Sequence, residues 1–112
     1  MSAGMIDVLY SGVMTGTKAQ VSDVEQDIAG YHILNETAAL SYLQIYYKLA
    51  AAVTVGTTVA DLVIPLPASG GATMKFEGKG WRTRGTGLTI AHTTTSTGAV
   101  SAAGYATIWR SR

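Results

Sequence analysis

Alternation of apolar and polar residues in one ten-residue stretch requires an extended backbone there. In LSYLQIYYKL (residues 40–49) like residues fall on every second position, and a strand places every second side chain on the same face. We expect one face to point into a core, and it consists of Leu43, Ile45, Tyr47 and Leu49. The other face is then a polar and aromatic surface suited to an interface or to contact with water, and it consists of Tyr42, Gln44, Tyr46 and Lys48.

Further strand patterns recur along the chain, separated by Gly, Pro, Ser, Asn and Thr. They are predicted at residues 6–10, 27–34, 62–67, 73–78, 88–93 and 105–110. Pro65 and Pro67 cannot donate ladder hydrogen bonds, so they place residues 62–67 at a sheet edge or strand end. Many short strands of this kind predict an all-β fold, an antiparallel β-sandwich of jelly-roll type.

Within residues 27–34, the alternation predicts which side chains share a face. It places Ile28, Gly30, His32 and Leu34 on one side, and Ala29, Tyr31 and Ile33 on the other.

The first 26 residues lack a sustained period, and we expect them to form an extended N-terminal arm. Residues 27–112 then make up the sandwich, which is consistent with one domain in 112 residues. The arm is too apolar for a free tail, so we expect it to pack on this domain or on a neighbour. The residues responsible are Ile6, Val8, Leu9 and Tyr10.

Composition excludes several classes of protein. Charged residues make up 13% of the chain and hydrophobic residues 47%, which is unlike a disordered chain. The absence of cysteine excludes disulfides and cysteine-ligated metals. The N-terminus lacks the basic start of a signal peptide, and no apolar run is long enough for a membrane helix. We therefore expect synthesis and folding in a cytoplasm, and no membrane partner.

Charge is unevenly distributed along the sequence. Residues 1–56 hold five acidic and two basic side chains, whereas residues 57–112 hold two acidic and six basic ones. Complementary ends can steer head-to-tail or ring assembly. The two halves of a sequence need not form separate faces, however, so the alternative is a set of unrelated, solvated charges.

The glycine-rich stretch from Gly78 to Gly87 fits no phosphate-binding motif, because neither a P-loop nor a dinucleotide fingerprint matches it. Its basic residues Lys79, Arg82 and Arg84 surround Trp81, a combination found in nucleic-acid interfaces. The chain carries a net charge of only +1, so we expect no nucleic-acid partner. The basic residues are instead expected to meet an acidic neighbour or solvent. Gly85 and Gly87 are expected to shape the turn before residues 88–93, because glycine tolerates positive φ.

No catalytic or metal-binding constellation is evident. His32 and His92 lack the spacing of metal ligands, and His92 lies on an apolar strand face. The acidic run Asp23, Glu25 and Asp27 lacks the glycine-centred loop of a calcium site, so we expect it to be solvated. We expect no enzyme activity and no cofactor. The glycosylation sequon at residues 35–37 is expected to be fortuitous.

The order of motifs resembles a known class of small proteins. The motifs are Asn35 at a strand end, LQIYYKL, Val55-Gly56-Thr57-Thr58, IPLP, Gly70-Gly71 and GLTIAHT. Over roughly residues 28–100 the chain resembles the small β-sandwich accessory capsid (cement or decoration) and head-fibre proteins of tailed bacteriophages, including cyanophages. Val59-Ala60 departs from the pattern, which has a proline after the paired threonines.

The resemblance implies a structural virion protein on the capsid surface. Such a protein is usually a homotrimer that binds the major capsid protein, bridges capsomers and performs no chemistry. Our candidate partner-binding residues are Ile6, Val8, Leu9, Tyr10, Tyr42, Tyr46, Lys79, Trp81, Arg82 and Arg84.

Two other functions remain open. One is a carbohydrate-binding or host-surface-binding module, with a stacking platform drawn from Trp81, Trp109, Tyr42 or Tyr46. The other is a tail or neck adaptor.

Overall fold

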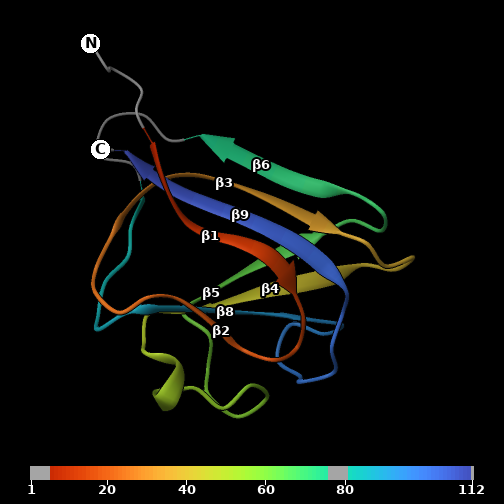
Figure 1. Cartoon of the computed structure of the whole chain (residues 1–112). Coiled ribbons are helices and arrows are strands. Elements are labelled where there is room, and N and C mark those ends of the chain that lie inside the picture. Colours follow the sequence, from red (N-terminus) through yellow and green to blue (C-terminus); the bar gives the residue numbers. More distant parts are fainter. Residues whose placement is uncertain (1–5, 76–80, 112) are drawn as a thin grey trace.

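The computed structural model describes residues 6–75 and 81–111. They form two antiparallel sheets packed face to face, which confirms the predicted all-β sandwich (Figure 1). The strands are β1 (Ile6–Met14), β2 (Ala19–Ser22), β3 (Asp27–Asn35), β4 (Ser41–Tyr46), β5 (Leu62–Leu66), β6 (Gly71–Lys75), β7 (Trp81–Arg82), β8 (Leu88–Thr93) and β9 (Gly104–Ser111).

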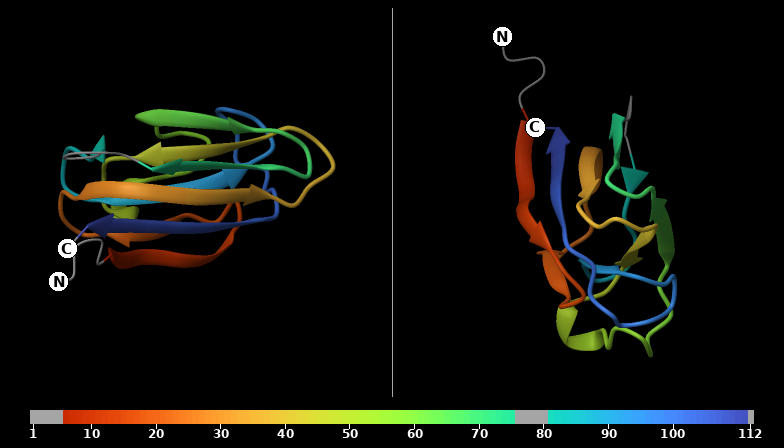
Figure 2. Two further views of the ribbon diagram at one scale, coloured as in Figure 1. Left: turned by 90° about the horizontal axis from the view of Figure 1, so that it is seen from above. Right: turned by 90° about the vertical axis from the view of Figure 1, so that its right-hand side faces the viewer.

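The five-stranded sheet has the order β1-β9-β3-β6, and β7 also pairs with β3; Figure 2 (left) shows this order. The four-stranded sheet has the order β2-β8-β4-β5. β5 therefore lies at an edge, as its prolines predicted. The main core lies between the sheets and includes Ile33, Leu43, Ile45, Ile90 and Ile108.

Residues that we expected to form an N-terminal arm lie within the sandwich. β1 pairs with β9 from Ile6↔Ser111 to Met14↔Gly104, and β2 pairs with β8. Met14 and Val21 are buried in the core. A bulge between Val8 and Tyr10 inserts an extra residue and breaks the two-residue period, which is why no sustained strand pattern was visible. Residues 1–5 lie outside the described part of the chain.

A second irregularity changes the predicted faces of β3. The register with β9 shifts between Ile28 and Gly30, so Ile28 joins Tyr31 and Ile33 in the core. His32, which we had placed on the same face as Ile28, is exposed on the opposite side. At both bulges the residues beyond the irregularity change face, and strict alternation cannot reveal this.

The outer face of β4 is covered rather than exposed. Leu43 and Ile45 point into the core as predicted, but Tyr46 and Gln44 are only 0% and 1% exposed. A short 3₁₀ helix, η1 (Ala50–Ala52), and the segment after it lie beyond the four-stranded sheet, on the side away from the other sheet (Figure 1). Val53 from this segment packs on Tyr46, which corrects the expectation that Tyr46 faces a partner. The strand ends at Tyr46, so Leu49 is exposed instead of buried.

Gly85 adopts the conformation expected before β8. Its φ is +89°, and a Cβ at this position would lie 2.3 Å from the Tyr47 carbonyl oxygen. Only glycine fits such a close approach at positive φ without strain.

Replacing Gly85 with alanine is expected to lower the free energy of unfolding by roughly 2 kcal/mol or more, because left-handed strain of about 1–2 kcal/mol adds to the clash. Urea denaturation measures the change. Gly12→Ala is the matched control, because a Cβ there meets its nearest atom at 3.8 Å. Equal stability of the two variants would contradict the assigned role of Gly85.

Candidate binding surface

The outer face of the five-stranded sheet is not covered by any described segment of the chain. Strand register places three rows of side chains across it. The apolar row is Val13, Tyr105 and Leu34; the polar row is Ser11, Thr107, His32 and Thr73; and the third row contains Val8 and Trp109. None of these nine residues is Asp, Glu, Lys or Arg. The register continues the third row through Gly30 to Lys75, so the three rows carry one basic position, at the β6 edge of the sheet.

The apolar row is accessible on this outer face. Val13 is 64% exposed and Tyr105 is 39% exposed, whereas Leu34 is half-buried. In the third row, Val8 is 56% exposed beside the half-buried Trp109. Exposed apolar side chains grouped in this way are typical of protein interaction sites.

Hydrogen bonds fix the polar row. The Ser11 hydroxyl lies 3.1 Å from the Tyr105 hydroxyl and 3.4 Å from that of Thr107. His32 Nδ1 lies 2.6 Å from the Thr73 hydroxyl. These side chains therefore contact one another across neighbouring strands.

Tyr10 protects the open edge of this sheet. Its hydroxyl donates a hydrogen bond to the Val13 carbonyl at 2.8 Å, and its ring passes Gly12 to reach it. Leu9 and Tyr10 also pack against the core. Of the predicted arm residues, Val8 thus contributes to the outer face, whereas Leu9 and Tyr10 stabilise β1; the side chain of Ile6 lies outside those described.

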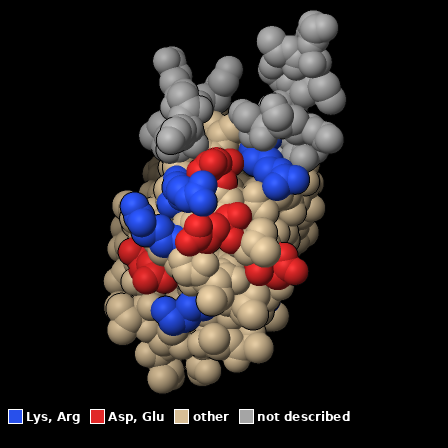
Figure 3. All heavy atoms as spheres, turned by 90° about the vertical axis from the view of Figure 1, so that its left-hand side faces the viewer, with Lys and Arg blue, Asp and Glu red and all other residues tan. Residues whose placement is uncertain are grey.

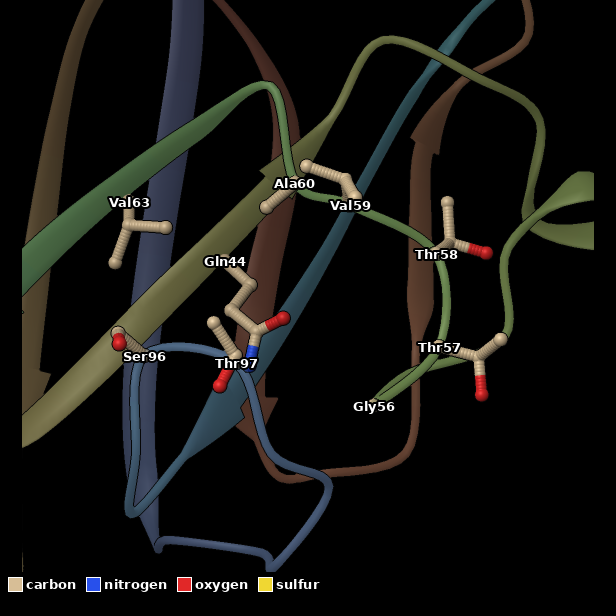
Figure 4. A pocket seen from close by; sticks show the side chains of 9 residues that line it. All are labelled: Gln44, Gly56, Thr57, Thr58, Val59, Ala60, Val63, Ser96 and Thr97. Atoms are coloured by element: carbon tan, nitrogen blue, oxygen red, sulfur yellow. The ribbon is translucent and has the colours of Figure 1, made fainter.

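The opposite surface carries a pocket of about 280 Å³ above β4 and β5. Figure 4 shows Gln44 between its two loops, one containing Thr57 and Thr58 and the other Ser96 and Thr97. The Gln44 amide group donates to the Thr93 hydroxyl and the Gly98 carbonyl, and it accepts from Tyr46. These bonds attach the loop that contains Ser96 and Thr97 to the sheet, and they occupy the polar groups of Gln44 within the chain.

The basic cluster is partly neutralised within the chain. Arg82 contacts Asp27 at 3.0 Å and Glu25 at 3.1 Å, and these ion pairs raise the pKa of Arg82. Figure 3 shows basic and acidic side chains interspersed on this side of the molecule. Arg84 is exposed, and Lys79 lies outside the described residues. The acidic run expected to be solvated thus supplies two of its carboxylates to Arg82.

Trp81 has a structural role. Its indole N–H donates to the Tyr47 hydroxyl at 3.0 Å, and its ring meets the Tyr31 ring edge-on at 6.3 Å. It therefore holds β7 against the core instead of presenting a stacking surface. Tyr42 is half-buried next to Pro65, at the pairing of β4 with the edge strand β5.

The sequence contained a signal for the uncovered outer face that we did not use. YATIWR alternates so that Tyr105, Thr107 and Trp109 share one side, while Ala106 and Ile108 fill the core. Periodicity alone does not reveal which of the two sheets is covered by its own loops.

In residues 6–75 and 81–111, no group of three or more His, Asp or Glu side chains is arranged to hold a metal ion. The same residues contain no helix that is long and apolar enough to cross a membrane. Comparisons with models of known protein families, with curated proteins and with solved structures give no match.

Proposed function

We propose that this protein is a structural virion protein that decorates a bacteriophage capsid and stabilises it by bridging capsomers. The observation that carries the proposal is the uncovered outer face of the five-stranded sheet, which is uncharged apart from Lys75 at its β6 edge. The resemblance of the strand and turn order to accessory capsid proteins supplies the partner, a major capsid protein. The proposal assigns the chain no catalytic role.

The size of the outer face limits the affinity of a single copy. Four strands spaced about 4.8 Å apart, with about six residues each, cover roughly 400 Å². A standard protein interface buries about 800 Å² on each partner, so one copy binding through this face alone would bind weakly. Several linked copies gain affinity through their effective concentration, which is the physical reason for proposing a homotrimer.

Stabilisation of the shell follows from mass action. A protein that binds only the assembled lattice shifts the equilibrium towards that lattice, without changing the chemistry of the capsid protein. Weak individual contacts suit this role because each copy can find its site reversibly.

The test compares two exposed valines on opposite surfaces. Val13 is 64% exposed on the proposed face, and Val59 is 84% exposed on a loop over the other sheet. Val13→Glu is expected to reduce occupancy on purified heads of the phage that encodes the chain at least tenfold, because it places a charge in an apolar contact. Val59→Glu is expected to bind as the wild type does.

Negative-stain microscopy with antibody labelling, together with sedimentation, measures occupancy and position. Thermal unfolding of both variants confirms that each one folds. Full occupancy of Val13→Glu would exclude this face, whereas absence of the wild-type protein from heads would exclude the decoration function. Label at the tail or neck would support the adaptor alternative. A glycan array tests the carbohydrate alternative, for which Tyr105 and Trp109 share the same outer face.

A further inference from the structure

His92 closes one end of the core. It is fully buried on β8, and its Nε2 lies 2.6 Å from the Ser41 hydroxyl at the start of β4. Gly104, which begins β9 in the other sheet, is so close that an added Cβ would lie 2.8 Å from the imidazole ring. The ring therefore occupies the space between the two sheets.

The backbone of His92 connects two further segments. Its N–H donates to the Thr15 carbonyl at 2.8 Å, in the connection between β1 and β2. Its carbonyl accepts from the Ala102 N–H at 3.0 Å, in the connection between β8 and β9. Displacement of His92 would thus loosen the points at which the chain passes from one sheet to the other.

The surroundings of the ring favour its neutral form. Nδ1 has no hydrogen-bond partner, and it is the one buried side-chain polar atom of the described residues in this situation. β4 presents the Ser41 hydroxyl, while β9 and the segment before it present the backbone of Gly104 and Ala102. None of these groups can carry a compensating charge. Burial lowers the pKa of His92, and the backbone of Ala102 opposes this in part.

We propose that His92 is an acid-sensitive latch: its neutral ring holds residues 94–103 against the end of the sandwich, and its protonation releases them. An imidazolium carries two N–H donors, and the site offers a side-chain partner to only one ring nitrogen. A buried cation without such partners is costly, so opening the site to water becomes the favoured response.

Residues 94–103 bury little apolar surface that opening would expose. Most of their side chains are exposed, and polar contacts hold them, among them the Gly16 N–H donating to Ser101 Oγ at 2.8 Å and the Gln44 amide donating to the Gly98 carbonyl at 2.9 Å. Segments with few buried apolar contacts open at lower free energy than the core strands. This inference does not depend on the proposed capsid function.

The preference of the site for the neutral ring determines the direction in which stability changes with pH. The folded-state pKa lies below the ordinary value of 6.5, so the stabilisation by His92 is complete above about pH 6.5. It is lost as the pH falls from 6.5 towards the folded-state pKa. Within that window the opening constant is expected to rise by up to about tenfold for each pH unit.

Native-state hydrogen exchange of the Ala102 amide reports on the latch directly, because this amide donates to the His92 carbonyl. Opening constants are compared at about pH 7.5 and about pH 5.5, after correction for intrinsic exchange. We expect opening to increase several-fold or more at the lower pH in the wild type and in His32→Gln, whose parent side chain is exposed. In His92→Gln, which can retain the bond to Ser41 without titrating, opening is expected to be independent of pH.

The proposal is overturned if Ala102 opening is the same at both pH values in the wild type, or if His92→Gln retains the wild-type pH dependence. Should His92→Gln fail to fold, NMR titration of the two wild-type histidines decides the question. A His92 ring that titrates near pH 6.5 while the Ala102 amide stays protected would also overturn it.

Discussion

Removal of residues 1–22 is expected to abolish cooperative folding. The deletion takes away β1 and β2, so β9 loses its partner from Ile6 to Met14 and β8 loses its partner at the sheet edge. Met14 and Val21, which are buried in the core, are lost as well. Each such side chain contributes roughly 1.5–3 kcal/mol, and a domain of this size is stable by only about 5–15 kcal/mol in total. The loss of β1, which leaves nine residues beside β9 unfilled, and the exposure of the core together cost more free energy than the native state has to lose.

Circular dichroism and urea unfolding measure this result. A chain without residues 1–5 is the control, because it keeps both strands intact, and it should unfold near the wild-type denaturant midpoint. A cooperative transition in the longer deletion would instead support the arm and the boundary at residue 26 that the sequence had led us to expect.

The periodic parts of the fold were predictable and the irregular parts were not. Alternation located β4 and β8, and it oriented Leu43, Ile45 and Ile90 correctly, because a regular strand buries every second side chain. It failed in β1 and β3, where a single inserted residue reverses the relation between position and face. Prolines placed β5 at an edge because a missing N–H is a local property.

The candidate site was harder to predict because it depends on coverage. Tyr46 and Tyr105 both belong to strands with an aromatic outer side, yet Tyr46 is 0% exposed and Tyr105 is 39% exposed. The difference lies in η1 and Val53, which come from sequence outside β4 and cover only one of the two sheets. Charge patterns had a similar limit, since the pairing of Arg82 with Asp27 joins residues far apart in the sequence.

Asn35 illustrates how a sequence motif acquires a different meaning in the fold. The sequon Asn-Glu-Thr places a buried asparagine at the end of β3, where its side-chain oxygen accepts from the Thr37 N–H at 2.9 Å and from the Thr37 hydroxyl at 2.7 Å. Its amide group donates to the carbonyls of Ala39, Leu66 and Pro67 at 2.9, 3.3 and 2.9 Å. One side chain therefore closes the turn after β3 and ties it to the end of β5 in the other sheet.

Replacing Asn35 with leucine is expected to lower the free energy of unfolding by roughly 3–5 kcal/mol. Leucine has the same branched set of four side-chain heavy atoms, so most of the effect comes from polar groups left without partners, each costing about 1–3 kcal/mol when buried. Its methyl groups are larger than the amide oxygen and nitrogen, and this overpacking adds to the loss. The expected loss is smaller than the sum of these costs over all the polar groups, because the carbonyls of Ala39 and Pro67 lie in partly buried contacts that water can approach. The expected loss is a large fraction of the stability of a domain of this size.

Urea denaturation measures the shift in midpoint, and the neighbouring exposed residue provides the control. Glu36→Ala changes the same turn without touching these hydrogen bonds, and it should stay within about 0.5 kcal/mol of the wild type. Thr37→Val removes only the hydroxyl, which contacts the Asn35 side-chain oxygen and the Ala39 carbonyl, so it should fall between the two, at about 1–2 kcal/mol. A loss below about 1 kcal/mol for Asn35→Leu would mean that the turn rearranges to satisfy the three carbonyls. The connection between the sheets would then rest on the apolar core and on His92, because Asn35 would no longer be needed to hold β5 against the end of β3.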